Sequence, residues 1–252
     1  MSIKIHRNKL DTKHFNTDDY FGEWTKKIDC LKDKFISAKP FEHVIIDNFL
    51  KQNVIDNIED KFPNNYENWY YYNNPLEKKY AYDEIENLDI SIQDIFYLLS
   101  TDKVINLFKK ISGIENLEYD EYLHGAGLHA HPREGKLAIH LDYEKHPITG
   151  KERRLNLILY LNKFWEKHWN GETEFWNNDV SECVTKSPIK FNSCLIFKTN
   201  DISWHGLPTA INCPNTVFRK TLAYYYISPL DNLESKKKYR EENISERKKI
   251  RK

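Results

Sequence analysis

His140 and Asp142 stand at the end of an expected β-strand and have the residue types of a metal site. The strand is the run 136–141, and strand side chains two residues apart project to the same face. A third ligand has to come from a distant part of the chain, and His205, which follows the expected strand 194–198, can supply it. Two histidines and one carboxylate fill about half of an octahedron, a set that is typical of non-haem Fe(II). We therefore expect these three residues to bind a metal ion that keeps open positions.

Open positions on such a metal suit a bidentate cosubstrate, whose far carboxylate needs a fixed cation. Arg219 begins the last expected strand, and a guanidinium grips a carboxylate through two parallel hydrogen bonds. Tyr160, on the expected strand 155–161, can offer a hydroxyl group to the same carboxylate. We expect Arg219 and Tyr160 to form the cosubstrate site beside the metal.

The specificity of this pattern lies in its order along the chain. A single His-x-Asp sequence arises easily by chance in a chain with 10 histidines. The full series, in which a second histidine follows a strand and an arginine opens the last strand, is much more specific. His129 and His131 form a rival metal pair, but glycines and a proline bound them, so we expect them in a loop.

The elements that must position these residues change in character near Gly113. Before it, a β-branched run predicts a strand over 41–47, the aromatic segment 64–83 is expected to be irregular, and residues 1–38 show no clear period. Apolar residues at helical spacing predict helices over 51–62, 90–100 and 102–112. After it, short β-rich runs predict strands over 136–141, 155–161, 172–176, 194–198 and 220–227. Helices followed by many short strands indicate an α+β fold whose second part is a barrel or jelly roll.

The charge distribution and the cysteine content indicate which partners and which compartment suit the protein. The 38 Lys and Arg residues balance 38 Asp and Glu, but the tail 232–252 holds nine Lys or Arg against four Glu. This basic tail is either a solvated terminus or a contact for an acidic partner such as RNA or a ribosome. The four cysteines are scattered, which fits a reducing compartment, and we expect a cytoplasmic protein. No apolar run predicts a signal peptide or a membrane span.

The segments that carry these residues resemble a known enzyme family. They are VIIDNFL, GAGLHAHPREGKLAIHLDY, RRLNLILYLNKFW, WNGETEFW, SWHGLP and RKTLAYYY. From about Phe41 to Ser228 the chain is similar to the Fe(II)- and 2-oxoglutarate-dependent dioxygenases, in the branch of the hypoxia-type and ribosomal-protein-type prolyl hydroxylases. The resemblance implies a double-stranded β-helix (a cupin-like jelly roll) with supporting N-terminal helices. We expect this domain at 39–230, after an extension at 1–38 and before a basic tail at 231–252.

The resemblance also implies roles and an activity. His140, Asp142 and His205 match the iron ligands, Arg219 the anchor for the 2-oxoglutarate carboxylate, and Tyr160 a residue that contacts this cosubstrate. The implied reaction hydroxylates an unactivated C–H bond, most simply of a prolyl residue in a protein, and releases succinate and CO2. Ascorbate is expected as a stimulant.

Two alternatives stay open at this point. One is the same chemistry on a free amino acid or another small metabolite, and the other is a non-enzymatic, cupin-like metal-binding module, which has no use for Arg219.

The aromatic segment 66–82 is relevant to the choice between a protein substrate and a small-molecule substrate. Its residues either pack over the helices or form a lid that grips an extended peptide, with Trp69, Tyr71 and Tyr72 as candidates.

Overall fold

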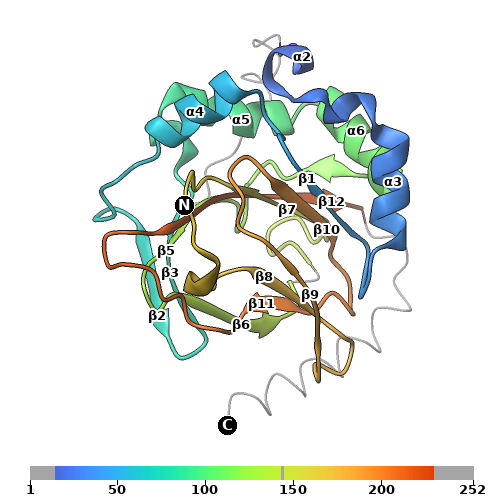
Figure 1. The fold of residues 1–252 in the computed structure, drawn as a ribbon. Coiled ribbons are helices and arrows are strands. Elements are labelled where there is room, and N and C mark those ends of the chain that lie inside the picture. The colour runs from blue at the N-terminus through green and yellow to red at the C-terminus, as the bar shows by residue number, and fades with distance from the viewer. Residues whose placement is uncertain (1–14, 143–144, 230–252) are drawn as a thin grey trace.

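A computed structural model describes residues 15–142 and 145–229 of the chain. Within these ranges, helices cover one side of an antiparallel sheet that curls into a nearly closed barrel (Figure 1). This is the α+β arrangement with a double-stranded β-helix core that the sequence predicts. The basic tail 231–252 lies outside the described residues.

The order of the strands in the sheet differs from their order in the chain. In the described part of the chain, twelve strands form one sheet with the path β1–β10–β7–β12–β5–β3–β6–β11–β8–β9, to which β2 adds beside β3 and β4 beside β12. Their bounds are β1 His43–Ile46, β2 Tyr70–Asn74, β3 Glu77–Tyr82, β4 Glu118–Tyr119, β5 Gly127–His131, β6 Lys136–His140, β7 Glu152–Tyr160, β8 Thr173–Trp176, β9 Cys183–Ser187, β10 Cys194–Lys198, β11 His205–Leu207 and β12 Arg219–Ser228. All the predicted strands are present.

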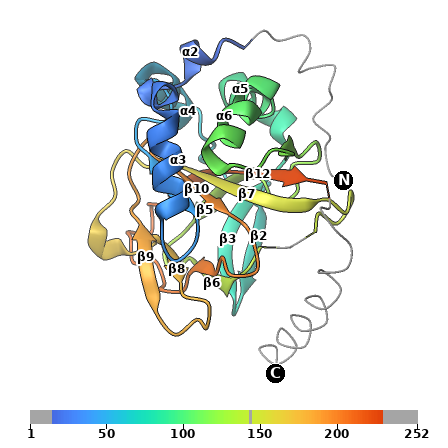
Figure 2. The same cartoon turned by 90° about the vertical axis from the view of Figure 1, so that its right-hand side faces the viewer.

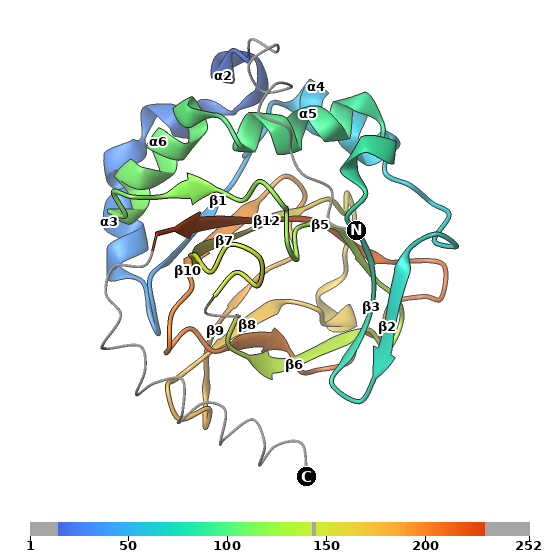
Figure 3. The ribbon, with the colours of Figure 1, turned by 180° about the vertical axis from the view of Figure 1, so that it is seen from behind.

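The helices lie together against the face of the sheet that β7, β10 and β12 form (Figures 2 and 3). Their bounds are α2 Thr17–Tyr20, α3 Ile28–Ser37, α4 Gln52–Asp60, α5 Ile90–Leu99 and α6 Asp102–Ser112, with short 3-10 helices η1 Glu23–Lys26, η2 Ile85–Asn87 and η3 Lys167–Trp169. Helix α6 shows why the predicted bounds hold. Its N-cap Thr101 accepts the N–H of Val104, and Gly113 ends it in the left-handed region at φ 73°. None of the described helices is long and apolar enough to cross a membrane.

The barrel wall separates two cores, because strand side chains alternate between its faces. Outward side chains such as Leu157, Leu222 and Tyr224 pack with the helices in the larger core. A second cluster occupies one side of the barrel interior: Phe41, Tyr160, Phe175, Leu195 and Phe197. The interior is therefore packed with rings on one side, and the polar residues described below occupy the rest.

Two local expectations were wrong, and a segment without a structural prediction contains a helix. The segment 64–83 contains the hairpin of β2 and β3, whose β2 side chains are mostly exposed, so no apolar alternation marks it. His129 and His131 lie on β5 and not in a loop. Residues 15–38 include α3, whose Leu31 and Phe35 pack into the larger core although few apolar positions mark the helix.

Candidate active site

The predicted metal ligands converge at one end of the barrel interior. His140 ends β6 and His205 begins β11, and the two residues lie directly opposite each other in the antiparallel pair. Asp142 follows two residues after His140. One ligand atom from each of the three residues lies within 4.8 Å of the others, and no other such group of three occurs among the described residues. Nε2 of His140 is 3.8 Å from Oδ1 of Asp142, and Nε2 of His205 is 3.9 Å from Oδ2.

The hydrogen bonds of the two histidines present the correct nitrogen to a metal. Nδ1 of His140 is 2.8 Å from the carbonyl oxygen of Ala138, and Nδ1 of His205 is 2.8 Å from that of Ser203. A carbonyl oxygen only accepts, so each Nδ1 carries the proton and donates it. Each Nε2 therefore turns an unprotonated lone pair toward Asp142, as a metal ligand requires.

Asp142 is held as an oriented carboxylate. Asn156 donates Nδ2–H to its Oδ2 at 3.1 Å, and the hydroxyl of Tyr225 donates to its Oδ1 at 3.4 Å. Burial raises the pKa of Asp142, but the neighbouring His205 and His140, Arg153 and the Asn156 hydrogen bond together hold it below its usual value. Burial and the neighbouring His205 lower the pKa of His140. Both groups thus favour the forms that bind a divalent cation, and the donor set fits Fe(II).

Arg219 supplies a buried positive charge that has no described counter-ion. It opens β12 and is 2% exposed, its Nη2 donates to Oγ1 of Thr173 at 3.2 Å, and its Nε has no partner in the described part of the chain. No carboxylate of the described residues pairs with it. A buried, unpaired guanidinium is costly, so the surroundings of Arg219 suit an anionic ligand.

Tyr160 meets Arg219 from the neighbouring strand β7. The guanidinium carbon of Arg219 lies 5.2 Å from the centre of the Tyr160 ring. The Tyr160 hydroxyl is 3.1 Å from Thr173 Oγ1 and 3.1 Å from Ser187 Oγ. The structure thus brings both predicted cosubstrate residues together, and it adds Thr173 as a shared partner.

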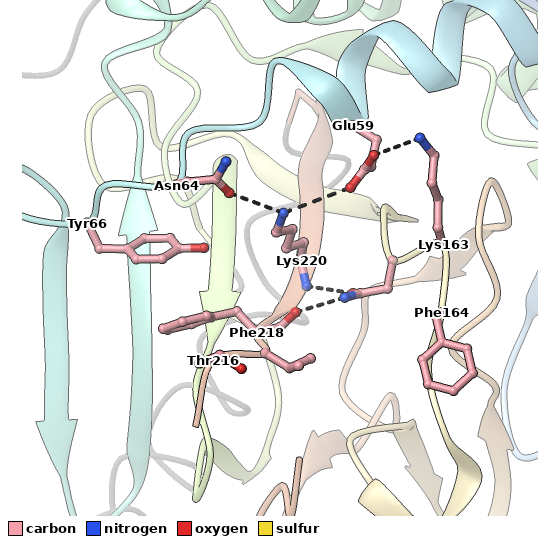
Figure 4. A pocket seen from close by; sticks show the side chains of 10 residues that line it. Glu59, Asn64, Tyr66, Lys163, Phe164, Thr216, Phe218 and Lys220 are labelled. Atoms are coloured by element: carbon pink, nitrogen blue, oxygen red, sulfur yellow. Dashed lines mark hydrogen bonds and ion pairs between the residues drawn. The ribbon is translucent and has the colours of Figure 1, made fainter. Parts of the chain in front are cut away.

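The side chain of Lys220 leaves the barrel on the opposite face from Arg219, as the alternation of side chains along β12 requires. Its Nζ is 3.5 Å from Oδ1 of Asn64 and 4.0 Å from Oε1 of Glu59, and it points into an outer pocket near Tyr66 (Figure 4). Arg219 and Lys220 are adjacent in the chain, but their positive charges lie on opposite faces of β12.

The candidate lid residues do not share one environment. Trp69 is 7% exposed and packs into the larger core against Phe62. Tyr71 stacks on Tyr80 with ring centres 4.4 Å apart. Tyr72 lies on the other face of β2, where Nζ of Lys79 is 5.2 Å from its ring centre.

Three residues of the site were not anticipated in these roles: Asn156, Thr173 and Tyr225. Asn156 lies four residues before Tyr160 on the same strand, so alternation places both on the interior face. Thr173 and Tyr225 occupy interior positions of expected strands in the same way. A signal existed for each, but an asparagine, threonine or tyrosine on a strand is too common to be singled out.

Comparisons with known proteins agree with this geometry. The family described as the 2OG-Fe(II) oxygenase superfamily matches residues 126–227, a range that includes the triad and Arg219. A search of curated proteins finds no match.

Solved structures share the fold. A prolyl hydroxylase from Trichoplax adhaerens, in complex with a hypoxia inducible factor peptide fragment, matches with a TM-score of 0.59 and 17% identity over 84% of this chain and 96% of its own. A Pseudomonas putida prolyl-4-hydroxylase matches with a TM-score of 0.55 and 12% identity, over 81% and 99% of the two chains. A 2OG-Fe(II) oxygenase family protein from Burkholderia pseudomallei has a TM-score of 0.55 at 10% identity, over 81% and 94%.

The family match, the fold and the buried site agree with the resemblance found in the sequence. They also favour an enzyme over a non-enzymatic metal-binding module. The name of the family implies Fe(II) and 2-oxoglutarate, and the donor set around Asp142 fits the metal. Residues 126–227 thus match the 2OG-Fe(II) oxygenase superfamily, in a chain whose fold is that of solved prolyl hydroxylases, and these findings support an oxidoreductase of the hydroxylase type.

Proposed function

We propose that this oxygenase hydroxylates a prolyl residue of a protein or peptide and converts 2-oxoglutarate to succinate and CO2. The observation that carries the proposal is the presence, in one barrel interior, of a three-residue metal site and a buried arginine without a described counter-ion. The prolyl substrate is proposed from the neighbours in fold, which include a prolyl hydroxylase bound to a peptide fragment.

In this proposal His140, Asp142 and His205 hold Fe(II), which when bound supplies the chemistry of oxygen activation. Their Nδ1 hydrogen bonds and the Asn156 contact fix the direction of the ligand atoms before the metal arrives. Three protein ligands leave the remaining positions to cosubstrate and O2.

Arg219 is proposed to bind the distal carboxylate of 2-oxoglutarate. Tyr160 supports it in two ways, because its ring lies beside the guanidinium and its hydroxyl contacts Thr173, the acceptor of the Arg219 Nη2 hydrogen bond. The aromatic rings of Phe175, Phe197 and Tyr160 close the interior on that side and exclude water from the bound cosubstrate.

The hairpin of β2 and β3 is proposed to contact the peptide. Tyr70 is 66% exposed and makes a ring contact with Tyr72, on the face of the hairpin that also carries Lys79. Lys79 shares its face of β3 with Ala81, which pairs with His129 of β5, so this face lies toward the barrel interior. We therefore keep Tyr72 as a candidate substrate contact and add Tyr70, whereas Tyr71, on the opposite face of β2, and the buried Trp69 gain no support from this face.

Two further parts of the proposal concern molecules outside the barrel. Ascorbate is proposed as a stimulant of turnover. The basic tail 231–252 is proposed to contact an acidic partner on account of its excess of Lys and Arg.

The test is to incubate the purified chain with Fe(II), 2-oxoglutarate, ascorbate and a lysate of host proteins. Succinate formation is measured, and sites that gain the mass of one oxygen atom are mapped. His140→Ala serves as the inactive control. Hydroxyproline on one or a few proteins supports the proposal. If only free amino acids or other small molecules are hydroxylated, the substrate is a metabolite and not a protein. If no substrate leads to succinate, the proposed enzymatic activity is refuted.

A further inference from the structure

His131 is buried in the barrel wall with neither ring nitrogen satisfied. It is the last residue of β5 and is 3% exposed, and among the described residues neither Nδ1 nor Nε2 has a hydrogen-bond partner. Buried polar groups are nearly always hydrogen-bonded, and an unpaired one destabilises the folded chain. Two ring nitrogens that no described residue satisfies point to a bound ligand.

The register of the sheet places His131 beside Arg219. The two residues are direct partners in the antiparallel pair of β5 and β12. Side chains of direct partners project from the same face, with Cβ atoms about 4.5–5.5 Å apart. Nε of Arg219 is also buried and has no partner within residues 15–142 and 145–229. Unsatisfied polar atoms from two neighbouring strands therefore face one region of the interior.

The charge state of His131 limits what it can bind. Burial, the positive charge of Arg219 and that of Lys79 lower the pKa of His131 well below its usual value. The ring is thus neutral, with one N–H donor and one acceptor nitrogen. A second metal ion on His129 and His131 is disfavoured, because the cationic Arg219 repels it and no third described ligand joins the pair.

We infer that His131 donates a hydrogen bond to the same distal carboxylate of 2-oxoglutarate that Arg219 binds. The inference rests on the proposed function, and it assigns to this chain a carboxylate site of one charged and one neutral donor group. Thr173 adds a hydroxyl that already accepts from Arg219. His131 thereby sets the affinity for a cosubstrate that carries a carboxylate at the far end.

The test measures binding and not turnover. The metal-free protein is loaded with Zn(II), and 2-oxoglutarate is titrated by calorimetry into wild type, His131→Leu and His131→Gln. A hydrogen bond to a charged group is worth about 1.5–3 kcal/mol, so His131→Leu should weaken Kd by about ten- to a hundredfold. His131→Gln keeps an N–H donor and should recover most of the affinity. His168→Leu, on an exposed ring paired with Glu166, is the matched control and should bind as wild type does.

A second ligand identifies the end of the cosubstrate that His131 contacts. 2-Oxopentanoate keeps the 2-oxo acid but lacks the distal carboxylate, so His131→Leu should leave its Kd within about twofold. An equal loss for both ligands would place His131 at the other end and overturn the inference. An unchanged Kd for 2-oxoglutarate in His131→Leu would overturn it as well. Failure of the wild type to bind 2-oxoglutarate would instead refute the proposed function.

A spectroscopic readout keeps the test informative if His131→Leu does not fold. The ring nitrogens of His131 in the Zn(II)-loaded wild type are followed by 15N NMR, with His131→Gln as the assignment control. Addition of 2-oxoglutarate should shift the protonated nitrogen of His131 and leave the His168 signals in place. No shift at saturating 2-oxoglutarate would overturn the inference.

Discussion

Replacing Arg219 by lysine tests the cosubstrate site with little change in charge. Arg219 is 2% exposed and donates Nη2–H to Thr173, which leaves its other N–H groups for a carboxylate. Lysine keeps the positive charge but loses the planar fork, so one of two charged hydrogen bonds is lost. Such a bond is worth about 1.5–3 kcal/mol, and about 1.4 kcal/mol corresponds to a tenfold change. We expect Arg219→Lys to raise the apparent KM for 2-oxoglutarate by about ten- to a hundredfold.

The assay is succinate formation as a function of 2-oxoglutarate concentration, with metal affinity measured separately by Mn(II) titration. Metal affinity should stay nearly constant, because Arg219 has no hydrogen bond or ion pair with the triad. Lys220→Ala is the matched control, since it removes the adjacent cation from the opposite face of β12. Its KM for 2-oxoglutarate should be that of the wild type.

The result that would refute this reasoning is a large rise in KM for Lys220→Ala together with none for Arg219→Lys. It would mean that the strand register is displaced by one residue, because such a displacement exchanges the two faces of β12. A parallel loss of Mn(II) affinity in Arg219→Lys would show that the metal and cosubstrate sites are not separate.

The other predictions concern the triad and a buried histidine. His140→Ala and His205→Ala should each abolish 2-oxoglutarate turnover with an unchanged circular dichroism spectrum, and near-normal succinate production in either would remove it from the metal site. Asp142→Gly should keep weak metal binding and lose hydroxylation, and full activity would show that another carboxylate replaces it. The pKa of His131 is lowered in the folded state, so the unfolded chain binds a proton first as pH falls below about 6.5. The free energy of unfolding of the metal-free protein should then fall by up to about 1.4 kcal/mol per pH unit from this residue, and urea titrations of His131→Leu should show a shallower slope.

Local sequence patterns were sufficient for elements whose apolar residues and end signals lie close together in the chain. Helix α6 was predicted with its bounds because its apolar stripe and its caps, Thr101 and Gly113, are encoded within a dozen residues. Strand β10 was predicted for a similar reason, since its run of buried residues has clear turn signals on both sides. The same alternation along strands allowed His140 and Asp142 to be paired, and Arg219 to be separated from Lys220.

Local patterns failed where the burial of a segment depends on distant partners. The tyrosines of β2 are exposed on both faces, so the hairpin exists because β3 pairs with β5 and β6 and not because of an apolar pattern. Trp69 and Tyr72 are three residues apart in one aromatic segment, yet one lies in the core and the other on the face that carries Lys79.

The sequence by itself determined which residue types are available for a metal and a carboxylate, and which neighbours share a strand face. Only the tertiary structure decided which strands lie side by side. It placed His205 opposite His140, and it set His131 beside Arg219 and not in a rival metal pair. The physical reason is that side-chain alternation is a property of a single strand, whereas pairing between strands far apart in the chain depends on how the whole barrel packs.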